Sequence, residues 1–110
     1  MKIVYLGTPD FAVAPLEEIV KAGYEVVAVV TQPDKPVGRK QILTPSAVKE
    51  CALKLGIKVL QYDKIRLQGV EDLKNLNPDL MVTCAYGQIL SQEILDIPKL
   101  GTIKFDHKRK

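Results

Sequence analysis

Cysteine and histidine are scarce in this chain, and no long apolar run occurs in it. The 110 residues include two cysteines and one histidine. Cys51 stands in a helical pattern and Cys84 in an apolar strand pattern, and this spacing fits neither a disulfide framework nor a metal site. We expect both to be small core residues. Because no run of about eighteen apolar residues is present, the sequence predicts no membrane span.

A signal peptide and a strong excess of charge are also missing. Residues 1–11 lack the charged region, long apolar stretch and cleavage site of a signal peptide, which favours a cytoplasmic protein. The formal net charge is +3, and residues 108–110 supply part of it, so charge alone does not indicate a nucleic-acid partner. The composition, 46% apolar and 26% charged, is typical of one small globular domain.

Apolar strand patterns alternate with helical patterns along the chain. We expect strands over residues 2–6, 25–31, 57–60 and 79–84. We expect helices over residues 11–21, 46–55, 67–76 and 91–95. Asp10 would cap the first of them and Gly23 would end it, and Ser91 would cap the last. Residues 32–44 form an unusually long connection. This alternation predicts a doubly wound α/β fold, a mostly parallel, Rossmann-like sheet with helices on both faces.

Ligands of such sheets bind beyond the carboxyl ends of the strands, at the switch in strand order. Three of the predicted loops lie there, at residues 7–10, 31–33 and 85–87. The first has Pro9 and Asp10 where a dinucleotide fingerprint needs glycine, so an ordinary Rossmann cofactor is not expected. By position alone, this loop is a tight turn that leads into a capped helix.

Three segments at these strand ends together resemble the methionyl-tRNA formyltransferase family. They are Gly7-Thr8-Pro9-Asp10-Phe11-Ala12, Thr31-Gln32-Pro33-Asp34-Lys35-Pro36-Val37-Gly38-Arg39 and Ala85-Tyr86-Gly87-Gln88-Ile89-Leu90. The resemblance covers residues 1–101. It implies a truncated sheet, the amino-terminal portion of a formyltransferase domain that spans residues 1–110, family-like over 1–103 and followed by a divergent basic tail at 104–110.

The resemblance implies transfer of a formyl group from 10-formyltetrahydrofolate to the α-amino group of methionine on initiator tRNA, without a metal. It assigns the folate-binding role to Tyr86, Gly87, Gln88, Ile89 and Leu90, because an apolar wall with free backbone groups suits a flat pterin. It assigns tRNA contact, with Arg39 foremost, to Lys35, Arg39 and Lys40. It implies a loop at the substrate end, made of Gly7, Thr8, Pro9, Asp10 and Phe11.

Without the resemblance, the same segments have simpler interpretations. Residues 32–44 would be a solvated surface loop. Residues 86–90 would be a strand-to-helix turn in which Tyr86 caps the core and Ile89 and Leu90 reach into it.

The resemblance ends after Ile103. The family has the segment Gly-x-Ile-Asn-x-His-x-Ser-Leu-Leu-Pro, whereas this chain has Lys104 at the Asn position and Asp106 at the His position. His107 stands one residue late, which on a strand turns it to the opposite face and leaves it a weak candidate base. No catalytic residue of the family is therefore intact, and we expect no formyl transfer by this chain alone.

Two other interpretations stay open. Another formyl-folate transferase, acting on a sugar nucleotide or on glycinamide ribonucleotide, would share the fold, although a small substrate does not need a long basic loop. A non-catalytic nucleotide- or RNA-binding module is the second. Under any of them a truncated sheet would expose an edge strand, and we expect self-association through that edge.

Overall fold

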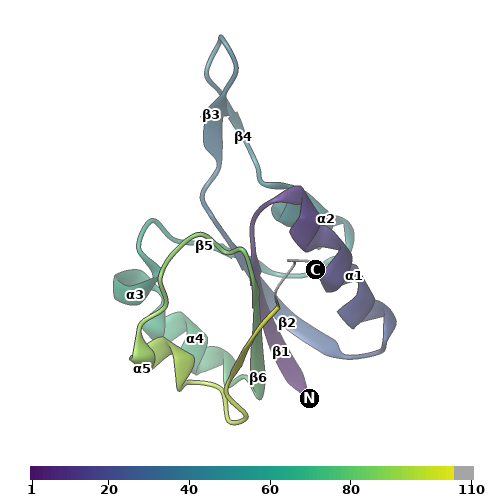
Figure 1. Ribbon diagram of the computed structural model, residues 1–110, viewed down its shortest axis with the longest axis vertical. Coiled ribbons are helices and arrows are strands. Elements are labelled where there is room, and N and C mark those ends of the chain that lie inside the picture. The colour runs from purple at the N-terminus through teal and green to yellow at the C-terminus, as the bar shows by residue number, and fades with distance from the viewer. Residues whose placement is uncertain (106–110) are drawn as a thin grey trace, which may run out of the picture.

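The computed structural model of the chain describes residues 1–105 and contains a five-stranded sheet (Figure 1). Its strands are β1 (Lys2–Gly7), β2 (Glu25–Thr31), β5 (Val59–Gln61), β6 (Leu80–Cys84) and β7 (Thr102–Lys104). They lie in the order β5-β2-β1-β6-β7, and every neighbouring pair is parallel. The chain moves outward from β1 to β5 and then returns past β1 to β6. The strand order therefore switches between β1 and β6, as a doubly wound sheet requires.

Helices cover both faces of this sheet (Figure 1). The 3-10 turn η1 (Asp10–Ala12) and the helices α1 (Val13–Lys21) and α2 (Ala47–Lys54) pack on one face, with Tyr5 in that core. The helices α3 (Ile65–Gln68), α4 (Val70–Leu76) and α5 (Gln92–Leu95) pack on the other, with Val4 in that core. Neighbouring residues of β1 enter opposite cores because side chains alternate along a strand. The predicted α/β fold is confirmed.

The first helix begins later than the sequence predicts. Asp10 is not its cap, because residues 10–12 form the 3-10 turn and the helix starts at Val13. Pro15 explains the difference. A helix from Phe11 would need a hydrogen bond from the backbone nitrogen of residue 15, which proline lacks, whereas a helix from Val13 places Pro15 in the first turn, where that donor is not needed.

The long connection after β2 contains a hairpin that the sequence analysis did not predict. Strands β3 (Lys35–Val37) and β4 (Ile42–Thr44) pair antiparallel and stand clear of the main sheet (Figure 1). Gly38 and Gln41, with φ of +78° and +53°, make the reversal between them. Gln41 donates two hydrogen bonds to the carbonyl of Gly38, from its backbone nitrogen at 3.2 Å and from Nε2 at 2.8 Å.

Two further boundaries differ from the prediction. The helix expected over 67–76 is two helices, α3 and α4, which meet at Gly69. A Cβ at this position would lie 2.8 Å from Cγ1 of Ile65, so the junction needs a glycine. The third main strand covers 59–61 rather than 57–60.

Two local predictions, the cap of the last helix and the burial of the cysteines, are confirmed. Ser91 caps α5, since its hydroxyl accepts a hydrogen bond from the backbone nitrogen of Ile94. Cys51 and Cys84 are free and buried in the core. In residues 1–105, no helix has the length and apolar character needed to cross a membrane.

Candidate functional site

The loops after β1, β2 and β6 meet at the switch in strand order. The hydroxyl of Thr8 donates a 2.6 Å hydrogen bond to the carbonyl of Tyr86 and accepts one from the backbone nitrogen of Gln32 at 3.3 Å. Gly7 lets β1 approach β6, because a Cβ there would lie 3.0 Å from the carbonyl oxygen of Cys84. One short side chain therefore joins three loops that are far apart in the sequence.

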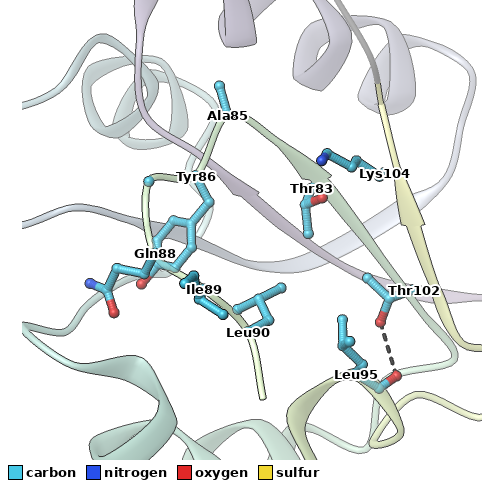
Figure 2. A pocket seen from close by; sticks show the side chains of 10 residues that line it. Thr83, Ala85, Tyr86, Gln88, Ile89, Leu90, Leu95, Thr102 and Lys104 are labelled. Carbon is cyan, nitrogen blue, oxygen red and sulfur yellow. Dashed lines mark hydrogen bonds between the residues drawn. The ribbon is translucent and has the colours of Figure 1, made fainter. Parts of the chain in front are cut away.

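A cavity of about 550 Å³ lies between the loop after β6 and the strand β7 (Figure 2). Its lining comes from the end of β6, the following loop, α5 and β7: Thr83, Ala85, Tyr86, Gly87, Gln88, Ile89, Leu90, Leu95, Thr102 and Lys104. All five residues that the resemblance assigns to folate are among them. The volume falls in the range usual for sites that hold small molecules and cofactors.

The apolar residues of this loop take different positions. The side chain of Ile89 is 89% exposed and lines the cavity, so the alternative that it reaches the core is wrong. Leu90 is half-buried and packs against the core that α3, α4 and α5 cover. Tyr86 is buried in that core as well as lining the cavity, and its burial raises the pKa of its hydroxyl to about 12. Tyr86 is therefore neutral at physiological pH.

The side-chain amide of Gln88 is held by the protein. Its Nε2 donates to Oε1 of Gln32 at 2.8 Å and to the carbonyl of Tyr62 at 2.7 Å. Its Oε1 accepts a 2.7 Å hydrogen bond from the backbone nitrogen of Ile65. Gln88 thus anchors the loop, and sequence reasoning missed its partner Gln32 as a member of the site. The sequence signals for Gln32 are its place in the strand-end loop at residues 31–33 and in the second segment of the resemblance, neither of which gives it a role.

Strand β7 supplies the opposite wall of the cavity. Thr102 and Lys104 line it, and the hydroxyl of Thr102 donates a 3.0 Å hydrogen bond to the carbonyl of Leu95. Figure 2 shows the side chain of Lys104 running toward Thr83, its register partner on β6. The position at which lysine replaces the expected asparagine therefore faces the cavity. His107, the weak candidate base, lies outside the described residues, as does Asp106.

The three predicted tRNA-contacting cations lie on the hairpin and are exposed. Arg39 and Lys40 occupy the turn between its strands, and Lys35 begins β3. Lys35 also lines a hollow of about 310 Å³ together with Thr8 and Pro9 of the first loop. The hairpin turn itself projects away from the cavity loop (Figure 1), so the structure does not bring the two predicted sites together.

The rest of the first loop faces elsewhere. Asp10 is exposed, and Phe11 lines a separate apolar hollow of about 400 Å³ with Ile19, Val82 and Phe105. Within residues 1–105, no cluster of three or more His, Cys, Asp and Glu side chains is arranged to hold a metal ion.

Comparisons with solved structures identify the architecture. The crystal structure of glycinamide ribonucleotide transformylase 1 from Geobacillus kaustophilus matches with a TM-score of 0.62 over 94% of this chain and 55% of that chain. The sequence identity is 15%, so this match shows the fold alone.

Sequence comparisons give the family. Methionyl-tRNA formyltransferase from Bacillus subtilis (strain 168) is 57% identical over 103 residues, which are 93% of this chain and 32% of that protein. The enzyme from Enterococcus faecalis is 55% identical, over 93% of this chain and 33% of its own length. The chain therefore spans about a third of the length of these curated relatives. The profile described as Formyl transferase matches residues 1–107, and the chain belongs to the formyl transferase family.

Proposed function

We propose that this chain provides the formyl-donor cavity and the tRNA-contacting hairpin of a methionyl-tRNA formyltransferase. The reaction would transfer the formyl group of 10-formyltetrahydrofolate to the amino group of methionyl initiator tRNA. One observation carries the proposal: the five residues assigned to folate all line a single cavity beyond the carboxyl end of β6, in a chain 57% identical to a protein of that name.

The chemistry of the lining fits a reduced folate. Ile89, Leu90 and Leu95 offer apolar surface to the faces of a flat pterin. Ala85 and Gly87 have φ of +52° and +104°, and these conformations turn the backbone sharply beside the cavity, where its polar groups can meet those of the pterin ring.

The β7 side of the cavity contributes Thr102 and Lys104 to the lining. In formyl transfer the amine nitrogen attacks the formyl carbon, the bond from that carbon to N10 breaks, and a proton leaves the amine for N10. The ammonium of Lys104 would stabilise the oxyanion of the tetrahedral intermediate. Lys104 is the only charged residue that lines the cavity within residues 1–105. A charged lysine does not accept a proton, so it cannot take the proton that the amine must lose. We therefore expect no transfer by this chain alone, and transfer above background by the purified polypeptide would contradict this.

Donor binding is tested by calorimetric titration with 10-formyltetrahydrofolate. Ile89→Asp should weaken binding about tenfold or more, because burying an isoleucine side chain contributes about 1.5–3 kcal/mol. The matched control is Leu53→Asp on α2, where the wild-type side chain is also exposed, and it should bind as the wild type does. Equal affinity of Ile89→Asp and the wild type would place the donor elsewhere.

Hairpin binding is tested with initiator tRNA at several salt concentrations. Arg39→Ala should weaken binding and reduce the slope of log affinity against log salt by about 1, since one phosphate contact is lost. Arg66→Ala on α3, outside the hairpin, is the matched control and should change neither. Binding of glycinamide ribonucleotide in place of tRNA would favour the transferase with a small substrate.

A further inference from the structure

Gln32 lies between the base of the hairpin and the loop that lines the candidate cavity. Its backbone nitrogen donates to the hydroxyl of Thr8, and its carbonyl accepts a 3.2 Å hydrogen bond from Nε2 of Gln61 on β5. Its side-chain oxygen accepts a 2.8 Å hydrogen bond from Nε2 of Gln88 in the cavity loop. A single half-buried residue is thus bonded to the loop after β1, to β5 and to the loop after β6.

The side chain of Gln32 also fits against the backbone of the cavity loop. A Cβ added to Gly87 would lie 2.6 Å from Nε2 of Gln32. Gly87 has a φ of +104°, a region that favours glycine. The amide of Gln32 therefore fills the space beside Gly87, and the path of residues 85–90 depends on where that amide lies.

The residues that follow Gln32 in the chain lead into the hairpin. Asp34, two residues along, directly precedes β3, and its carboxylate is held from two other elements. Gln61 Nε2 donates to its Oδ1 at 2.9 Å, and Lys49 Nζ of α2 lies 3.1 Å from each of its oxygens. Gln61 bonds the carbonyl of Gln32 with the same nitrogen, so residues 32 and 34 are clamped as one unit.

We propose that Gln32 is a positioning residue that couples the hairpin to the loop lining the cavity. A displacement of the hairpin base moves the backbone of Gln32, and its side chain passes the change to Gln88 and Gly87. The coupling is a property of the chain without ligands. A functional role for the coupling rests on the proposed function. Binding of tRNA by the hairpin and of formyl donor in the cavity would each change the affinity of the chain for the other ligand, by the same factor.

The coupling is tested on the ligand-free chain by amide hydrogen exchange. Lys49→Met removes the ion pair at the hairpin base and should speed exchange of the amides of residues 86–90 by about fivefold. In a Gln32→Leu background, Lys49→Met should cause no further change there. Gln32→Met serves as a second uncoupling variant, and protection of β1 amides checks that each variant is folded.

Gln92→Leu is the matched control. Gln92 is an exposed glutamine on α5 that donates a 2.9 Å hydrogen bond to Asp96, away from Gln32. In this background the response to Lys49→Met should be the same as in the wild type. An equal response in the Gln32→Leu background, or no response of residues 86–90 in the wild type, would overturn the proposal.

A second measurement separates the coupling from the proposed function. The affinity for 10-formyltetrahydrofolate, measured with and without initiator tRNA, should change about fivefold in the wild type and not in Gln32→Leu. Failure of both ligands to bind would count against the proposed function, whereas the exchange experiment decides the coupling on its own.

Discussion

Two buried tyrosines on the same side of the sheet differ in what their hydroxyls contact. Tyr62 donates a 2.7 Å hydrogen bond to Oδ2 of Asp72, and its pKa is raised first by burial and then by that bond. The hydroxyl of Tyr86 is buried and has no hydrogen-bond partner within residues 1–105. A buried polar group without a partner destabilises the folded state, whereas a bonded one does not.

Removing the two hydroxyls should therefore have opposite consequences. We expect Tyr62→Phe to lower the free energy of unfolding by about 1 kcal/mol, because it loses a hydrogen bond to a carboxylate that water can also solvate. We expect Tyr86→Phe to leave the free energy of unfolding unchanged or to raise it by up to about 1 kcal/mol. Urea denaturation of the two variants measures this, and an equal loss in both would show that Tyr86 does have a partner.

At this scale the sequence predicted five of the ten residues that line the cavity, but not how they are held. Tyr86 to Leu90 follow a buried strand, and their place at the strand end brings them to the cavity. The hydrogen bond from Gln88 to Gln32 joins residues 56 positions apart. Such a contact depends on the order of the strands, which no local pattern determines.

Among the elements, the hairpin depends on a carboxylate at its base. The pKa of Asp34 is held below its usual range, first by the hydrogen bond from Gln61 and then by the one from Lys49. A lowered pKa in the folded state means that the ionised carboxylate stabilises the structure at neutral pH. That stabilisation is lost as the pH falls below the usual carboxyl range and through the lowered value.

We expect the hairpin to loosen in acid before the main sheet does. Amide exchange of residues 35–44 should accelerate as the pH falls through the titration of Asp34, after correction for the intrinsic pH dependence of exchange. Asp34→Asn should remove this transition, because a neutral amide does not titrate and cannot pair with Lys49. If the corrected exchange of residues 35–44 in the wild type did not depend on pH, the carboxylate of Asp34 would not be the anchor of the hairpin.

Element boundaries were predictable where local chemistry decides them. Ser91 as the cap of α5 needed only the residues that follow it. The hairpin was missed because its six strand residues, all exposed, pair with each other and not with the main sheet, so they show no buried pattern. The predicted start of the first helix was wrong because proline fits only the first turn of a helix, so Pro15 moves the start to Val13.

For the whole molecule, the alternation of apolar strands and helices predicted the doubly wound, parallel α/β class, which the structure confirms. The alternation does not predict whether the outer edge of the last strand, β7, is paired. Within residues 1–105, strand β7 pairs with β6 alone, and apolar residues in and next to it are exposed, with Leu100 at 68% and Ile103 at 51%. Such an edge is a template for pairing with another chain.

We therefore expect the chain to self-associate through β7. Ile103→Lys should shift the population toward monomer, because a charged side chain at an edge opposes strand pairing. Leu67→Lys on α3, where the leucine is 70% exposed, is the control and should leave the association unchanged. Light scattering after size-exclusion chromatography measures the molar mass, and a wild-type chain that is monomeric at high concentration would refute this expectation.

The proposed function requires that the cavity between the loop after β6 and strand β7 binds the formyl donor. Backbone amide chemical shifts of the chain, followed by NMR during titration with 10-formyltetrahydrofolate, test it most directly. We expect saturable shifts that centre on residues 83–90 and 102–104, with smaller shifts at Gln32. No saturable shift, or shifts centred on the apolar hollow beside Phe11 and Phe105, would contradict it.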